Sequence, residues 1–192
     1  RLGGKTHMAV IRIANEAQIP TADFNKLVDA VKYFIPLVTK AWGIQPFEID
    51  TGLPSNTGDW MVLLTEQNRK VGAAGYHEIV NGVPTAICSP KASTTLYGRY
   101  RKPIVIAGKT LFPELWTSGL VTTICHEIAE MLADPYVKTI SAKDTQGRQW
   151  LVEVCDHAFG SYSYYNGCVL PDFTYPAFYQ LNSKGPYSAF NG

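Results

Sequence analysis

The amino-acid sequence predicts an α+β domain in which a mixed, mostly antiparallel sheet packs on two long helices. Three observations predict it: two segments repeat apolar residues at helical spacing, several short runs are β-branched, and two Asn-Gly pairs each separate a pair of strand-like runs. Asn-Gly in that setting is the strongest short-range hairpin signal. At 192 residues, the chain is long enough for one domain with a full core, expected over residues 8–192.

Strand and helix signals alternate through the first half of the chain. Short apolar runs indicate strands at Val10–Ile13, Phe47–Asp50 and Trp60–Leu64. A helix is predicted from Thr21, its expected N-cap, to Trp42, with Pro36 kinking it or ending it early. Ala73–Val80 and Val83–Cys88 then form a hairpin around Asn81-Gly82, and Pro84 suggests that the second arm has an exposed edge.

The second half begins with a second long helix, expected from about Ser118 to Ala133 because Pro135 follows it directly. Gln149–Cys155 is predicted to be a strand. Tyr162–Tyr165 and Cys168–Leu170 flank Asn166-Gly167 and predict a second hairpin. The remaining tail, from Phe159 onward, is rich in Tyr and Phe.

Composition excludes several classes of protein. With 46% hydrophobic and 17% charged residues, the chain is not disordered. A net charge of +1 without a basic stripe argues against a nucleic-acid partner, and the apolar runs are too short for a membrane span. We expect a soluble protein of the cytoplasm or a virion, without a secretory signal, in which Arg1–His7 are a cloning remnant before a natural start at Met8. The cysteines lack C-x-x-C spacing and are expected to be free, buried thiols: Cys88, Cys125, Cys155 and Cys168.

The second long helix carries a pattern suited to metal binding. His126 and Glu130 are four residues apart, so they share a face of the helix and can both reach one cation. Glu127 is rotated from His126 by about 100°, where a carboxylate can act as general base for a metal-activated water. The alternative is an ordinary amphipathic helix with a solvated polar face.

A second polar cluster, Glu153 to His157, follows some twenty residues later. A carboxylate such as Glu153 inside an apolar strand is costly to bury unless it is paired or metal-bound. An exposed strand face or an ion pair with Lys or Arg is the competing explanation. Glu153, Asp156 and His157 therefore remain alternative downstream ligands, of which we favour Asp156, with Glu153 as a ligand or its neighbour. Asp134 is expected to bond the backbone that follows the helix.

The order of these elements, from Val10 to Asp156, and the His126-Glu127 pair resemble the zincin metallopeptidases. The segment from His126 to Pro135, with the stretch Glu153–Asp156 after it, is also similar to uncharacterised zincin-like proteins of phages and bacteria. The resemblance implies that His126 is the first metal ligand, that Glu127 is the general base, and that a third ligand comes from downstream. This sequence departs from the family because Glu130 stands where the second histidine is expected, which makes the motif HExxE.

Two functions follow from this resemblance. The first is a metal-dependent hydrolase of peptide or amide bonds. The second is a non-catalytic zincin-like structural or binding protein, such as a phage virion component, with a structural or vestigial metal site. Zn²⁺ is the ion expected first, but the added carboxylate also suits Mn²⁺ or Ca²⁺.

Two further segments of the sequence concern the binding of peptide or protein partners. Residues 77 and 78 repeat the His-Glu pair, but in a strand neighbouring side chains point to opposite faces, so no metal pair is expected there. An extended peptide or protein could pair with Ala73–Val80 as an edge strand. The Tyr-rich tail could line a groove, form a contact face or simply cover the core.

Overall fold

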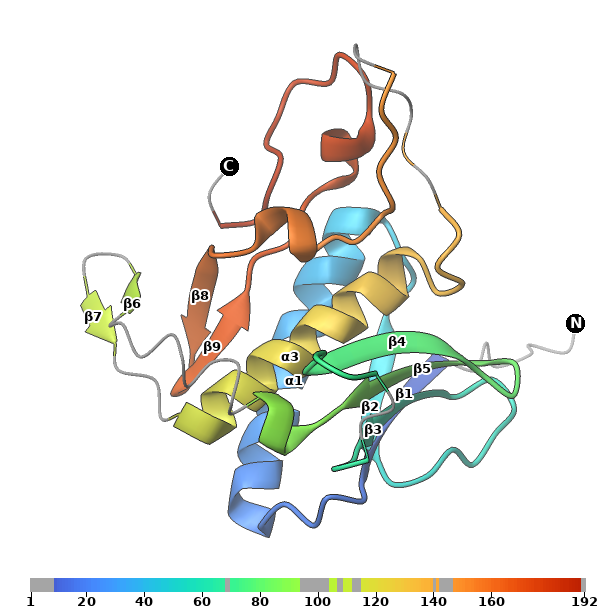
Figure 1. Ribbon diagram of the computed structural model, residues 1–192, viewed down its shortest axis with the longest axis vertical. Coiled ribbons are helices and arrows are strands. Elements are labelled where there is room, and N and C mark those ends of the chain that lie inside the picture. Colours follow the sequence, from blue (N-terminus) through green and yellow to red (C-terminus); the bar gives the residue numbers. More distant parts are fainter. Residues whose placement is uncertain are drawn as a thin grey trace, which may run out of the picture.

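The computed structural model describes residues 9–67, 70–93, 104–106, 109–111, 115–139, 141 and 147–190. The expected remnant Arg1–His7 lies outside these ranges. Two long helices, α1 (Thr21–Trp42) and α3 (Leu115–Ala133), lie beside a five-stranded sheet (Figure 1). The sheet comprises β1 (Ala9–Asn15), β2 (Phe47–Thr51), β3 (Trp60–Leu64), β4 (Gly75–Val80) and β5 (Val83–Cys88). Two small hairpins are formed by β6 (Ile104–Ile106) with β7 (Lys109–Leu111), and by β8 (Tyr162–Tyr165) with β9 (Cys168–Pro171).

The five-stranded sheet is mixed but mostly parallel, so the prediction of a mostly antiparallel sheet is wrong. Its strand order is β2-β1-β3-β5-β4. Strand β1 runs parallel to β2 and β3, and β3 runs parallel to β5, whereas only β4 is antiparallel to its neighbour. The physical reason lies in the connections: β1 reaches β2 through α1, and a helical crossover returns the chain in the same direction.

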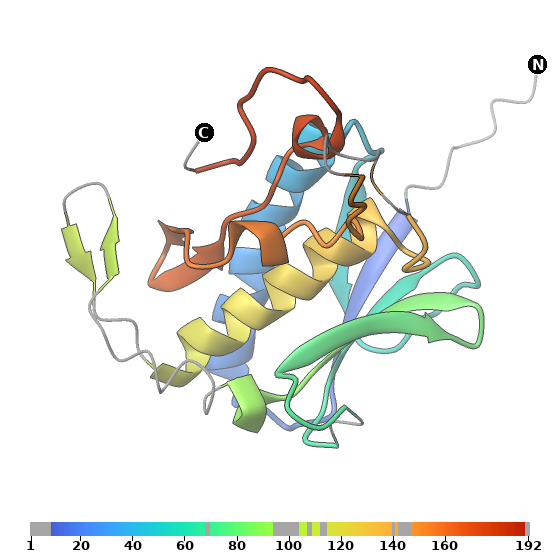
Figure 2. The same ribbon diagram turned by 45° about the horizontal axis from the view of Figure 1, so that its top comes forward.

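The core lies between one face of the sheet and the two helices, which pack against each other (Figure 2). Alternate residues on the strands point to this face, as the period of a strand requires. Five of the fully buried ones are Ile11, Ile13, Val62, Leu64 and Ala86. They meet apolar side chains of both helices, including Leu27, Val31, Phe34, Ile124 and Ile128. This burial fixes the face that α3 turns toward the sheet.

Both predicted hairpins form, and their turns have the backbone that Asn-Gly favours. The φ angles are 52° and 82° at Asn81 and Gly82, and 46° and 82° in the β8–β9 turn. The exposed edge belongs to β4 and not, as Pro84 suggested, to β5. Pro84 pairs only with Ile79 of β4 and precedes Thr85, where pairing with β3 begins, so no interior hydrogen bond to β3 is lost there.

Two other predictions need correction. Helix α1 continues through Pro36 to Trp42, and its N-cap residue is Pro20 in place of Thr21. Gln149–Cys155 is not a strand, although Val152 and Val154 are buried. Its backbone instead makes separate bonds to different neighbours: the Val152 N–H donates to Thr139, and the Val154 carbonyl accepts from Thr174. Burial alone can therefore imitate a strand pattern in an irregular segment.

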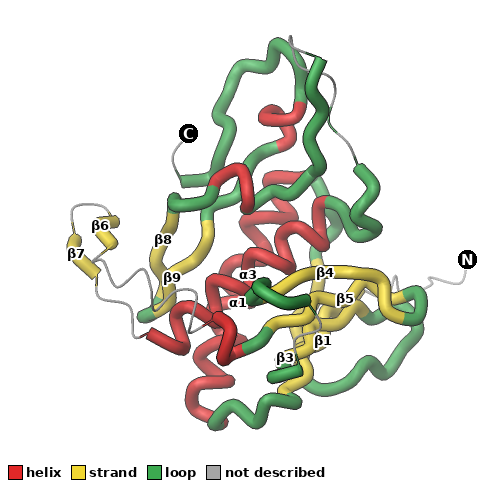
Figure 3. The backbone as a smooth tube through the Cα atoms, in the orientation of Figure 1, coloured by secondary structure: helices red, strands yellow, loops and turns green. Residues whose placement is uncertain are grey.

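The C-terminal tail is mostly irregular and covers one side of the helix pair (Figure 3). Aromatic residues of the tail pack against α1: Tyr165 stacks on Tyr33 with ring centroids 3.9 Å apart, and Phe173 meets Phe34 edge-on at 5.6 Å. Phe173 is almost fully buried. These contacts show that part of the tail completes the core.

Two predictions, one about the cysteines and one about membrane spans, can be compared with the structure. All four cysteines are buried free thiols, which confirms the expectation from their spacing. Within the described ranges, neither long helix combines the length and the apolar character that crossing a membrane requires.

On β1, Arg12 organises the loop between β2 and β3. Its Nε donates to Asp59 Oδ2 at 2.7 Å and its Nη1 donates to Asp50 Oδ2 at 2.6 Å. The backbone N–H groups of Ser55 and Asn56 also donate to Asp59 Oδ2. The hydrogen bond from Arg12, with those from the backbone, lowers the pKa of Asp59 to about 2.

This network predicts an acid-sensitive contribution to stability. Because the pKa of Asp59 is lower in the folded chain than its unfolded value of about 3.9, the ionised group stabilises the fold above that value. The contribution is lost as the pH falls through about 4 toward 2. We expect the free energy of unfolding to fall less steeply over this range in Asp59→Asn than in the wild type, as measured by urea denaturation. Arg12→Met should flatten the curve similarly, and wild-type and variant curves that run parallel would contradict the assignment.

Candidate functional site

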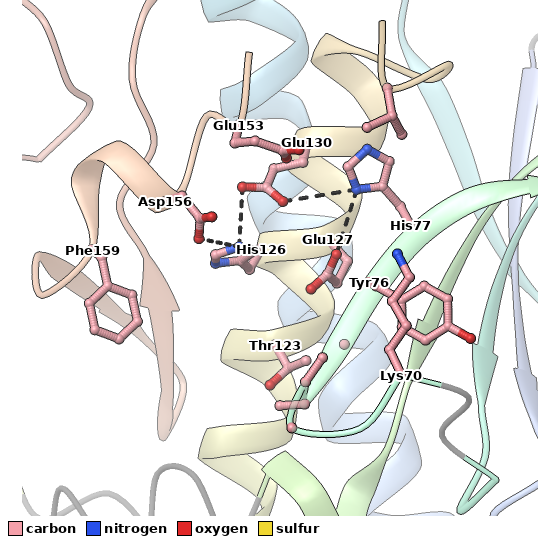
Figure 4. Close-up of a pocket in the computed structure, with 15 residues that line it drawn as sticks. Lys70, Tyr76, His77, Thr123, His126, Glu127, Glu130, Glu153, Asp156 and Phe159 are labelled. Carbon is pink, nitrogen blue, oxygen red and sulfur yellow. Dashed lines mark ion pairs between the residues drawn. The ribbon is translucent and has the colours of Figure 1, made fainter. Parts of the chain in front are cut away.

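Helix α3 and the segment after it bring the three main predicted ligands together. His126 and Glu130 lie one turn apart on α3, and Asp156 begins the short 3-10 helix η1 (Asp156–Ala158). His126 Nε2 lies 3.1 Å from Glu130 Oε1 and 3.3 Å from Asp156 Oδ1 (Figure 4). Burial by itself lowers the pKa of His126, but the nearby carboxylates of Glu130 and Asp156 outweigh it and hold the pKa well above its usual value.

A backbone contact fixes the downstream segment against the helix. The N–H of Cys155 donates to Glu130 Oε1 at 3.3 Å, so the same oxygen faces both His126 and this backbone group. Glu153, two residues earlier, also lines the site. Burial, followed by the charge of Glu130, raises the pKa of Glu153 to about 7.

Two other candidates lie outside this cluster. His157 is surrounded by aromatic rings: its ring is stacked 5.2 Å from Phe178 and meets Trp150 edge-on at 5.8 Å. Asp134 follows the end of α3, where Oδ2 accepts the backbone N–H of Thr139 at 2.7 Å and Oδ1 accepts its hydroxyl at 3.0 Å. Asp134 therefore organises the turn after the helix.

Sequence reasoning missed one residue of the site, His77 on β4. Its strand partner is Ala86, whose side chain lies in the core, so His77 points from the sheet edge toward α3. His77 Nδ1 lies 3.6 Å from Glu127 Oε2 and 3.9 Å from Glu130 Oε2 (Figure 4). The residue is only 7% exposed, and its Nε2 has no hydrogen-bond partner among the described residues. A buried imidazole with an unpaired nitrogen is costly unless a ligand satisfies it.

Gly75 allows β4 to approach α3 closely enough for this contact. A Cβ at residue 75 would lie 2.7 Å from Thr123 Cγ2 and 2.8 Å from both Cγ and Oε1 of Glu127. Only glycine fits this crossing without displacing those atoms. Glu127 is consequently confined between its own helix and the edge strand, and burial raises its pKa despite the opposing effect of His77.

These side chains line a pocket of about 320 Å³ between α3, β4 and the downstream segment. The edge-strand side contributes Lys70, Gly72, Ala73, Ala74, Gly75, Tyr76 and His77. The opposite side contributes Thr123, His126, Glu127, Glu130, Val137, Glu153, Asp156 and Phe159. Four carboxylates thus face two imidazoles, and the cation among the described lining residues is Lys70, which lies over the ring of Tyr76.

The donor set fits a divalent cation. Bonds of about 2.0–2.2 Å from one ion to its nitrogen and oxygen ligands place neighbouring ligand atoms roughly 3.0–3.6 Å apart. The distances from His126 to Glu130 and Asp156 fall within this range. In the part of the chain that the structure describes, two groups bring ligand atoms within 4.8 Å of one another: His126 with Glu130 and Cys155, and His77 with Glu130 and Glu153. A site of this kind can hold a metal and place a carboxylate, Glu127, beside it.

Comparison with known proteins adds little at the level of sequence. None of the protein-family models matches this chain, and no curated protein matches it significantly. Among solved structures, archaemetzincin from Methanopyrus kandleri is similar to the chain, with 17% sequence identity and a TM-score of 0.34. The match covers 67% of this chain and 74% of archaemetzincin.

Proposed function

We propose that this protein is a metal-dependent hydrolase of peptide or amide bonds. The observation that carries the proposal is the convergence of His126, Glu130 and Asp156 in one pocket that also contains Glu127. His126 lies at a ligand-like distance from Glu130 of its own helix and from Asp156 of the downstream segment, and the carboxylate of Glu127 lines the same pocket. Hydrolysis by an activated water needs a metal site and a general base, and these residues could supply both.

Each residue has a defined role in this proposal. His126, Glu130 and Asp156 would hold the cation, with Zn²⁺ expected first and Mn²⁺ or Ca²⁺ also suited to the carboxylates. When bound, such a cation acts as a Lewis acid that polarises water or a carbonyl. Glu127 accepts the proton of the water that attacks the carbonyl carbon, and delivers it to the leaving amine nitrogen. Its raised pKa favours holding that proton between the two steps.

The first test is metal binding. Purified protein is stripped with a chelator, incubated separately with Zn²⁺, Mn²⁺ and Ca²⁺, freed of unbound ions and subjected to elemental analysis. We expect stoichiometric metal in the wild type and a reduced content in His126→Ala, because the imidazole contributes a ligand. Glu48→Ala, at an exposed position on β2, is the control that should bind as the wild type does.

The outcome separates the competing functions. A wild type that binds none of these ions would overturn the proposal. Stoichiometric metal without hydrolysis of a broad peptide mixture would favour the non-catalytic alternative, in which the ion only stabilises the fold. Peptide capture along β4 and through the tail remains part of the proposal, because β4 is an edge strand of the sheet formed by the described residues and lies next to the pocket.

A further inference from the structure

The pocket contains two imidazoles on opposite sides of one carboxylate. Glu130 Oε1 faces His126 Nε2 at 3.1 Å, whereas Glu130 Oε2 faces His77 Nδ1 at 3.9 Å (Figure 4). Glu130 is 3% exposed, and the N–H of Cys155 holds its Oε1 in place. The two oxygens of a fixed carboxylate therefore point toward two different sets of donors, which is the geometry of a bridging ligand.

Each side of Glu130 has a second acidic group. Asp156 Oδ1 lies 3.3 Å from His126 on one side. On the other side, Glu153 and His77 each offer an atom that lies within 4.8 Å of the other and of a Glu130 oxygen. Each set thus combines one imidazole, one carboxylate of its own and a share of Glu130.

An independent observation points to a ligand in the second set. His77 is 7% exposed, and its Nε2 has no hydrogen-bond partner among the described residues. Its Nδ1 lies 3.6 Å from Glu127 and 3.9 Å from Glu130, so neither nitrogen makes a short contact with a carboxylate. Nδ1 is the nitrogen that faces these carboxylates, and a cation between them would give it a close partner. The excess of carboxylates over cationic side chains at this site attracts such a cation.

We propose that the pocket binds a pair of divalent cations bridged by Glu130, one held by His126 and Asp156 and the other by His77 and Glu153. The first of these positions rests on the proposed function, and the second is new. The chemical consequence is an additional positive charge on the β4 side of the pocket, next to Glu127. The ions of two-metal sites lie about 3.5–4 Å apart and together stabilise the charge that develops on the reacting groups.

The test counts Mn²⁺ ions and asks whether they are neighbours. The chelator-stripped protein is titrated with Mn²⁺, bound metal is measured after gel filtration, and the loaded protein is examined by electron paramagnetic resonance. We expect two equivalents in the wild type, with a spectrum broadened by exchange coupling between the ions. His77→Ala should retain one equivalent and give the spectrum of an isolated ion.

Two further variants keep the test decisive. Glu153→Gln should also lose one equivalent, and it remains informative if His77→Ala does not fold. Glu78→Gln is the matched control, since this neighbour of His77 on β4 pairs with Thr85 and belongs to the opposite face of the sheet. Saturation of the wild type at one equivalent, or two equivalents in His77→Ala, overturns the pair but leaves the proposed function intact. A wild type that binds no Mn²⁺, Zn²⁺ or Ca²⁺ overturns both.

Discussion

Replacing Glu127 with glutamine is expected to lower hydrolysis of fluorescein-labelled casein by about 10²–10⁴-fold, the usual contribution of a general base. Glutamine has nearly the same shape, so it fits the narrow space beside Gly75. Its amide cannot accept the proton of the attacking water. The ligand side chains of His126, Glu130 and Asp156 are unchanged, and the metal content should therefore equal that of the wild type.

The measurement pairs the initial rate of fluorescence release with elemental analysis of the same preparation. Glu78→Gln removes a carboxylate from the same sheet edge, but outside the pocket lining, and should leave both quantities unchanged. Unaltered hydrolysis in Glu127→Gln would show that another group accepts the proton. A joint loss of metal and activity would instead make Glu127 a ligand.

Local signals explain the parts of the fold that could be predicted. The helix ending before Pro135 and both Asn-Gly hairpins depend on interactions between residues close in sequence. Strand direction is a different kind of property, because it depends on which strands pair. The element order β1-α1-β2 already carried that information, since a helix between adjacent strands returns the chain in parallel.

In the candidate site, too, a local pattern predicts some residues, whereas others are brought in by distant segments. His126 and Glu130 were found because a single helix presents them on one face. His77 reaches the site from a strand more than forty residues earlier, and no local pattern connects it with α3. A signal was nevertheless present: the two-residue turn at Asn81-Gly82 pairs residue 77 with Ala86, which places His77 on the core face of the hairpin. As an adjacent pair on a strand, His77 and Glu78 point to opposite faces, so the pair predicts no site although His77 alone reaches one.

The downstream segment illustrates a limit of alternation as a signal. The sequence places Glu153 inside a predicted strand, yet Gln149–Cys155 forms no strand. Its position is set by tertiary hydrogen bonds, including that from Cys155 to Glu130, which no pattern within the segment encodes. The choice among Glu153, Asp156 and His157 as neighbours of His126 therefore required the three-dimensional structure.

Glu130→Ala should have the largest effect on metal binding, because this carboxylate lies between both imidazoles. At a Mn²⁺ concentration about 100 times the dissociation constant, each bound ion raises the free energy of unfolding of the wild type by about 2.7 kcal/mol. We expect no such increase in Glu130→Ala at the same concentration. Urea denaturation with and without Mn²⁺ measures the difference directly.

Glu130→Gln separates loss of charge from loss of structure. The glutamine carbonyl can still accept the hydrogen bond from the Cys155 N–H, so this variant should keep the downstream segment against α3. Because the carboxylate charge is gone, its stabilisation by Mn²⁺ should still fall far below that of the wild type. A full metal-dependent gain in Glu130→Ala would show that the ions do not depend on Glu130. In that event His126 with Asp156 and His77 with Glu153 would have to be independent sites, without a shared ligand.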